Sequence, residues 1–159
     1  MKISFTLNGQ PREVEVEPRR LLADVLRHQM GCYGVHLGCE HGVCGACTVL
    51  IDGKSNLSCL TLAPMANGTE IVTIEGLRGP AGELHPLQRS FNQEHGLQCG
   101  FCTPGFILAS LDLINRLGIP DPQTIRDELS GNICRCTGYV NIVKAVQRAA
   151  LEMAAEHNS

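Results

Sequence analysis

The sequence has few aromatic residues: no tryptophan, two tyrosines and four phenylalanines among 159 residues. This supply is thin for one large core and favours two small cores. No apolar run approaches the roughly 20 residues of a membrane span, so we expect no membrane insertion. The net charge of −3 offers no basic face to nucleic acid. The hydrophobic and charged fractions, 43% and 18%, are typical of a soluble folded protein.

The start of the sequence does not resemble an export signal. Residues 1–7 alternate in polarity and predict a first strand instead of a signal peptide. We therefore expect a cytoplasmic protein in a reducing environment. In that environment the nine cysteines favour metal ligands or reactive groups over disulfides.

The first half of the chain predicts a small mixed β-sheet crossed by one helix. Asn8-Gly9 is a hairpin signal, residues 21–27 have helical spacing, and residues 31–46 form a glycine-rich loop. We expect strands at residues 2–8, 11–17, 48–51 and 69–74. This order favours a β-grasp, although the pattern alone also suits other α+β arrangements.

The second half of the chain predicts helices. A glycine- and proline-rich stretch at 77–82 is the expected linker, which divides the chain into domains at 1–76 and 83–159. We expect helices at residues 85–95, 104–117, 122–129 and 141–155. Short connections between four helices predict a small bundle, so the fold class is α+β with a C-terminal four-helix bundle.

The first group of cysteines lies in the glycine-rich loop. Cys39, Cys44 and Cys47 form the pattern C-x4-C-x2-C, and Cys59 follows farther along the chain. This is the plant-type spacing of a [2Fe–2S] cluster. Zinc is the rival metal, but three cysteines within nine residues do not match a common zinc ribbon. The glycines of the loop leave room for amides to turn toward an anionic centre.

The second group combines a CxxC with a CxC. Its members are Cys99, Cys102, Cys134 and Cys136, and each pair precedes a predicted helix. Thr103 is the expected N-cap of the first of these helices. Two helix N-termini would direct positive dipole ends at a metal held by four thiolates. Here the residues alone leave both zinc and an iron–sulfur cluster open.

Two further residues have side chains that can bind metal but fit neither pattern. Cys39-Glu40-His41 matches half of a Rieske pattern, but no Cys-x-x-His follows, so His41 is expected to be a solvated loop residue. Cys32 has no partner in either pattern and is expected to act as a small buried hydrophobic residue.

Three motifs together resemble a known family. Residues 38–49, 98–105 and 133–139 are similar, in order and spacing, to the iron–sulfur subunit of the molybdenum hydroxylases, the family of xanthine oxidase, aldehyde oxidoreductase and carbon monoxide dehydrogenase. The resemblance covers essentially the whole chain, without a departure at any of eight ligand positions. It implies a plant-ferredoxin-like domain followed by a four-helix domain, each with one [2Fe–2S] cluster, and it disfavours zinc at the second site.

The resemblance also implies roles for individual residues. The first four cysteines would hold the cluster nearer a flavin, and the second four the cluster nearer molybdenum. Gln98 and Cys136 would lie against the pterin of the molybdenum cofactor, where a glutamine amide offers both a donor and an acceptor.

The expected function is therefore electron transfer without a substrate site or catalytic residue in this chain. Electrons would pass from a large molybdenum–pterin subunit to a medium FAD subunit or another acceptor, in an (αβγ)2 assembly that is an oxidoreductase. Substrate choice would belong to the molybdenum subunit. The alternatives are a free-standing two-cluster carrier and a zinc-stabilised interaction module.

Overall fold

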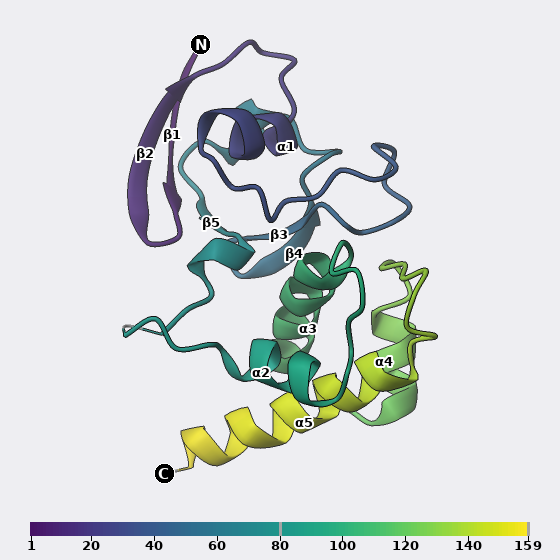
Figure 1. Cartoon of the computed structure of the whole chain (residues 1–159). Helices are drawn as coiled ribbons and strands as arrows, with labels where there is room; N and C mark the ends of the chain where they lie inside the picture. The colour runs from purple at the N-terminus through teal and green to yellow at the C-terminus, as the bar shows by residue number, and fades with distance from the viewer. Residues whose placement is uncertain (80, 159) are drawn as a thin grey trace.

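The structure is a computed structural model that describes residues 1–79 and 81–158. Pro80 of the expected linker and Ser159 of the expected helical domain lie outside the described residues. The strands gather in the first half of the chain, and the long helices lie below them in the second half (Figure 1). This confirms the predicted α+β class.

The first half forms a five-stranded mixed sheet in the order β2-β1-β5-β3-β4. The strands are β1 (Lys2–Leu7), β2 (Gln10–Glu15), β3 (Thr48–Ile51), β4 (Lys54–Leu57) and β5 (Glu70–Val72). β1 and β5 are parallel, and the other neighbours are antiparallel. The predicted hairpin is confirmed, with Asn8 and Gly9 both at positive φ between β1 and β2.

Two strand predictions need correction. β4 was not predicted, because Lys54–Leu57 lacks apolar alternation and lies at an edge of the sheet. The turn Asp52-Gly53, with both residues at positive φ, makes β3 and β4 a second hairpin. The last strand ends at Val72 instead of residue 74, because a short 3-10 helix, η3 (Ile74–Gly76), begins there.

One face of the sheet is covered by the predicted N-terminal helix. It begins as α1 (Leu22–Asp24) and continues as a π-helical segment, η1 (Val25–Gln29). Leu22, Val25 and Leu26 are fully buried there. They share a core with the inward side chains of the sheet, which include Ile3, Phe5, Leu7, Val49 and Ile71.

The second half is helical, as predicted. Its helices are α2 (Pro86–Gln93), α3 (Thr103–Leu117), α4 (Pro122–Glu128) and α5 (Val140–His157). Asp121 caps α4 by accepting hydrogen bonds from the amides of Gln123 and Thr124. Gly118, at φ 71°, ends α3. α3 lies directly below the sheet, and α5 runs across the bottom of the molecule (Figure 1).

The two halves pack against each other through the sheet. Leu50 of β3 belongs to the helical core with Phe106 and Leu113 of α3, whereas Val49 belongs to the core of the first half. Leu77, at the start of the expected linker, is also buried in the helical core. β3 therefore contributes side chains to both hydrophobic cores.

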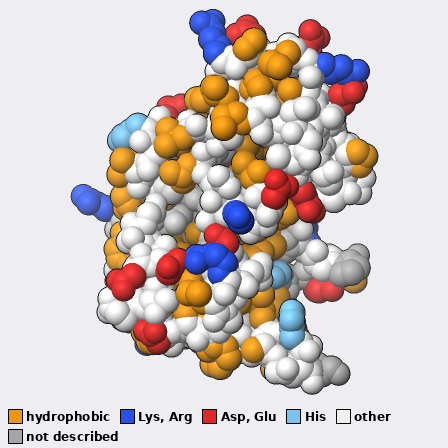
Figure 2. All heavy atoms as spheres, turned by 180° about the vertical axis from the view of Figure 1, so that it is seen from behind, with side chains coloured by type: hydrophobic (Ala, Val, Ile, Leu, Met, Phe, Trp, Pro, Cys, Tyr) orange, Lys and Arg blue, Asp and Glu red, His pale blue; other side chains and the backbone are white. Residues whose placement is uncertain are grey.

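The outer surface carries mixed charge. On the face turned away in Figure 1, basic side chains are scattered, and most lie near acidic ones (Figure 2). Among the described residues, no helix has both the length and the apolar character needed to cross a membrane.

Candidate metal centres

The first group of cysteines meets beside the end of the sheet. Cys39, Cys44 and Cys47 lie on the loop that leads into β3, and Cys59 follows β4. The thiol of Cys44 lies close enough to Cys39 to help lower its pKa, and the thiol of Cys47 lies close enough to Cys59 to help raise its pKa. The charge of Cys39 also raises the pKa of Cys59, so these two thiols lie near each other. The four thiols are thus brought together as two pairs.

Backbone amides turn toward the sulfur of Cys39. Hydrogen bonds from the amides of His41, Cys44 and Val43 lower the pKa of Cys39 to about 6. The last two amide nitrogens lie 3.4 and 3.3 Å from Sγ. Amides directed at sulfur stabilise a thiolate, which is the form that binds metal.

Cys59 is in a different environment. Burial, followed by the neighbouring thiol of Cys47, raises the pKa of Cys59 to about 11. Without a metal this inner thiol would stay protonated. A bound cation would offset that cost, because coordination deprotonates a thiol.

Glycines keep the first loop open. Gly42 has a φ of 83°, and a Cβ there would lie 2.4 Å from a methyl group of Leu60. A Cβ on Gly38 would lie 3.2 Å from the sulfur of Cys44. A side chain at Gly38 would enter space next to a thiol, and one at Gly42 would collide with Leu60.

The second group of cysteines meets between the starts of two helices. Cys99 and Cys102 precede α3, and Cys134 and Cys136 lie between α4 and α5. The sulfurs of Cys99 and Cys136 are 3.6 Å apart and exposed. Cys102 contacts Cys134, which is buried. These thiols also form two pairs, one at the surface and one inside.

The two thiols of the inner pair have pKa values that are shifted in opposite directions. Burial, followed by the thiol of Cys134, raises the pKa of Cys102 to about 12. Burial also acts to raise the pKa of Cys134, but hydrogen bonds that include those from the hydroxyl and amide of Thr137, at 3.1 and 3.4 Å, outweigh it and lower that pKa. Cys134 is therefore the member of this pair that holds negative charge more readily.

The start of α3 differs slightly from the prediction. The helix begins at Thr103, so Cys102 occupies the cap position and Thr103 does not cap the helix. The hydroxyl of Thr103 is buried, and no hydrogen-bond partner for it is found among the described residues. A buried hydroxyl without a partner is costly, and it directly follows a candidate ligand. This fits a site completed by a group with acceptor atoms.

The pairing of the thiols suits a binuclear cluster. In a [2Fe–2S] cluster each iron takes two thiolates, whereas zinc gathers four ligands around one ion. Each group contains two pairs of thiols. In the first group, backbone amides also donate to sulfur, and glycines leave space beside the thiols. These features fit one [2Fe–2S] cluster per group.

The remaining candidates lie near or away from these centres. The side chain of Gln98 donates a hydrogen bond of 3.0 Å to the carbonyl of Cys136, so these two residues are neighbours. His41 Nδ1 lies 2.6 Å from the carbonyl oxygen of Cys39. Cys32 is buried in the core of the first half, where burial raises its pKa.

Sequence reasoning missed the residues that bridge the two centres. The amide of Ile133 donates to the carbonyl of Cys44 at 2.9 Å. Asn132, which is 9% exposed, donates from Nδ2 to the carbonyl of Gly45 at 3.1 Å. His36 stacks on Phe101, with ring centroids 4.7 Å apart. The sequence signal for these contacts is the polar Asn132, two residues before the CxC motif.

Comparisons with known proteins agree with this geometry. The family described as "2Fe-2S iron-sulfur cluster binding domain" matches residues 5–70. The family described as "[2Fe-2S] binding domain" matches residues 73–147. Each match contains one complete cysteine group.

Similar proteins include subunits of oxidoreductases. The beta subunit of the 6-hydroxypseudooxynicotine dehydrogenase complex of Paenarthrobacter nicotinovorans is 50% identical, over 91% of this chain and 90% of its own length. The structure of quinoline 2-oxidoreductase from Pseudomonas putida 86 has a TM-score of 0.93 at 48% identity, over 99% of this chain and 96% of that one. Aldehyde oxidoreductase from Desulfovibrio gigas has a TM-score of 0.93 at 42% identity, over 98% of this chain and 17% of that one.

Proposed function

Because the chain belongs to the iron–sulfur subunits of the molybdenum hydroxylase family, we propose that it relays electrons from a molybdenum–pterin subunit to a flavin subunit or another acceptor. The observation that carries this proposal is the pair of four-thiol centres joined by the hydrogen bond from Ile133 to Cys44. When bound, each [2Fe–2S] cluster would accept and release one electron.

The eight cysteines of the two groups would hold these clusters. We assign Cys39, Cys44, Cys47 and Cys59 to the cluster nearer the flavin, and Cys99, Cys102, Cys134 and Cys136 to the cluster nearer molybdenum. Amides directed at Cys39 and the hydroxyl of Thr137 at Cys134 would stabilise the negative charge of each centre. Burial of Cys47 and Cys59 would exclude water from the first centre.

The second centre is the one suited to the molybdenum cofactor. Cys99 and Cys136 are exposed, and Gln98 is held against Cys136 by its side-chain hydrogen bond. Gln98 and Cys136 would then lie against the pterin, with the glutamine amide as hydrogen-bonding partner.

We extend the proposal to the domains and the assembly. Residues 1–76 would be the plant-type ferredoxin-like domain with a β-grasp fold, supported by the parallel β1–β5 pair under α1. Residues 77–82 would link it to a four-helix bundle at 83–159, supported by the shared core of the helices. The partners would be a large molybdenum subunit and a medium FAD subunit in an (αβγ)2 complex in the cytoplasm.

Electron paramagnetic resonance of the dithionite-reduced complex tests the proposed function. We expect two distinct [2Fe–2S] signals, about four iron atoms per chain, and molybdenum in the co-purified partner. Two signals without molybdenum would favour a free-standing carrier. One signal together with zinc would contradict the assignment of the second centre.

Replacement of Cys136 by serine tests whether electrons enter this chain at Cys136. We expect turnover of the complex to fall at least about tenfold, which corresponds to about 1.4 kcal/mol on the barrier, while the molybdenum content stays measurable. The slowed step should be reoxidation of the molybdenum centre, followed by stopped-flow spectroscopy. Unchanged turnover would contradict the assigned role of Cys136.

A further inference from the structure

The halves of the chain meet along a seam that joins β3 and β4 to α3. Its centre is apolar, because Leu50 of β3 packs against side chains of α3 in the helical core. Its near side lies at the candidate metal centres, where Ile133 and Asn132 bond to the first cysteine loop. Its far side lies at β4, the edge strand that leads to Cys59.

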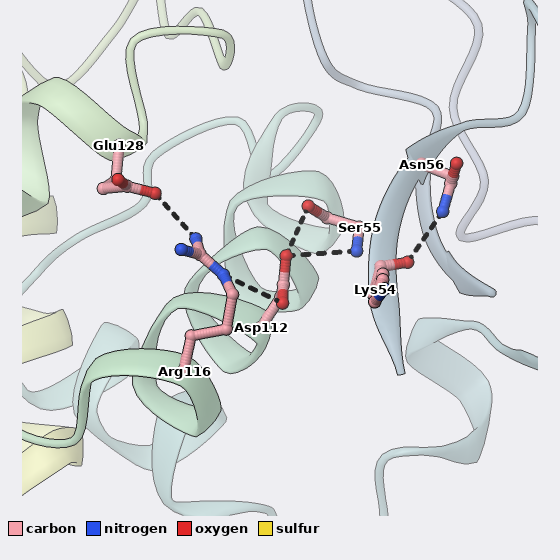
Figure 3. A network of polar contacts seen from close by, with 6 residues as sticks. All are labelled: Lys54, Ser55, Asn56, Asp112, Arg116 and Glu128. Carbon is pink, nitrogen blue, oxygen red and sulfur yellow. Dashed lines mark hydrogen bonds and ion pairs between the residues drawn. The ribbon is translucent and has the colours of Figure 1, made fainter. Parts of the chain in front are cut away.

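A buried carboxylate holds the far side. Asp112 of α3 is 6% exposed, and its Oδ2 accepts hydrogen bonds from the amide of Ser55 at 3.2 Å and from its hydroxyl at 2.7 Å (Figure 3). An edge strand has outward amides that no neighbouring strand can pair. Asp112 supplies the missing acceptor from the other half of the chain.

The carboxylate is itself connected to α4. Its Oδ1 accepts a hydrogen bond of 3.3 Å from Nε of Arg116, and the same guanidinium pairs with Glu128 at 2.6 Å (Figure 3). Ser55 lies shortly before Cys59, and Glu128 lies shortly before Cys134. The network therefore joins the segment that delivers a ligand of the first centre to the segment that delivers one of the second.

Packing alone does not close this side of the seam. A crevice of about 220 Å³ lies between the near and far sides, lined by residues that include Ser55, Asn56, Leu57, Arg116, Glu128 and Asn132. β4 is held in the sheet by its pairing with β3, and because the contact with α3 borders open space, the hydrogen bonds of Asp112 are what tie β4 to α3 on this side. Burying a carboxylate is costly unless donors compensate it, and Ser55 and Arg116 supply three.

We propose that Asp112 is a positioning residue that fixes the distance between the two clusters, through its clamp on Ser55 of β4. The inference rests on the two-cluster assignment above. Without the clamp, the near-side bonds of Ile133 and Asn132 would act as a pivot. The first half could then rock against the helices, and the intercluster distance would vary from molecule to molecule.

Pulsed dipolar electron paramagnetic resonance on the reduced complex tests this proposal. The dipolar coupling between two reduced clusters depends on the inverse cube of their distance, so it reports rocking directly. We expect a narrow distance distribution in the wild type and a broadened one in Asp112→Ala, with the iron content unchanged. A distribution as narrow as that of the wild type in Asp112→Ala would overturn the proposal.

Matched variants separate positioning from general loss of stability. Asp112→Asn keeps an oxygen acceptor for Ser55 and should restore a narrow distribution. Glu152→Gln weakens the pair between Arg89 of α2 and Glu152 of α5, which lies within the helical half, and should leave the distribution narrow. Broadening in Glu152→Gln equal to that in Asp112→Ala would also overturn the proposal.

A milder substitution tests the proposal if Asp112→Ala fails to bind both clusters. If Asp112→Ala binds too little iron, Ser55→Ala removes only the hydroxyl bond and should broaden the distribution to a smaller extent. An unchanged distribution in Ser55→Ala would then count against the clamp. Wild-type protein that lacks two clusters would instead contradict the proposed function itself.

Discussion

At the residue scale, Gly45 shows how closely the two centres approach each other. It has a φ of 72°, and a Cβ at this position would lie 2.5 Å from the carbonyl oxygen of Gly131 and from the side-chain nitrogen Nδ2 of Asn132. Gly53 has a similar φ of 78°, but nothing lies near its missing Cβ. The two glycines therefore share a backbone constraint and differ in the space around them.

Replacement of each glycine by alanine should separate these two effects. Gly53→Ala should cost about 1–2 kcal/mol, the penalty for a left-handed backbone. Gly45→Ala should add about 1–3 kcal/mol for overpacking, with a further fall of about 2–4 °C in Tm per kcal/mol. Loss of visible cluster absorbance on heating measures both values. Equal losses in the two variants would mean that the approach at Gly45 is not tight.

The sequence predicted which cysteines come together but not what joins the two groups. Spacing identifies Cys39, Cys44 and Cys47 because they share one short loop. In contrast, Asn132 and Gly45 are far apart in the sequence and make a single contact, which leaves no periodic signal. Asp112 was equally hidden, since a carboxylate within an apolar helix can face either solvent or another part of the chain.

At the element scale, prediction succeeded where local signals were strong. The hairpin at Asn8-Gly9 was confirmed because turn chemistry acts over a few residues, and the cap of α4 by Asp121 is an equally local contact. β4 was missed because its place at the edge depends on its pairing with β3 and on α3 beside it. The C-terminal boundary of β5 was also misjudged, because η3 follows it.

Helix α2 has an unusual cap that should respond to pH. His85 accepts a hydrogen bond at Nδ1 from the amide of Leu87, and the side chain of Gln88 accepts one from the amide of His85. Burial, followed by the charge of Arg89, lowers the pKa of His85 below 6.5, although Glu152 and Glu156 oppose this. Nδ1 can accept this bond only while the imidazole is neutral.

The stability contributed by this cap should therefore be lost in acid. A lowered folded pKa means that the unfolded chain binds the proton more tightly, so the contribution is complete above 6.5 and declines as the pH falls toward the folded pKa. His85→Asn keeps an acceptor that does not titrate. Its Tm should fall less than that of the wild type between about pH 7.5 and 5.5, around the ordinary histidine pKa of about 6.5.

Two further variants control this measurement. His85→Ala removes the cap and should cost about 1 kcal/mol at pH 7.5. His28→Asn replaces an exposed histidine and should leave the pH dependence as in the wild type. A pH dependence in His85→Asn identical to that of the wild type would show that His85 does not titrate as described.

At the scale of the whole molecule, we propose that the cysteines divide between metal binding and packing. Eight converge in two groups, and Cys32 lies within the core of the first half. We expect about four iron atoms per chain in the wild type and in Cys32→Ala, and about two in Cys59→Ser. Iron and acid-labile sulfide analysis of the purified complex measures this. A loss of iron in Cys32→Ala would contradict the division.

The contribution of β3 to both hydrophobic cores has a consequence for synthesis of the chain. When the chain has emerged through β5, all five strands exist, but α3, which covers Leu50, does not. At about 5–20 residues per second, the residues up to the end of α3 take about 2–9 s to be added. During that interval the nascent sheet presents an uncovered apolar face on which a neighbouring chain or a chaperone can bind before the second half arrives.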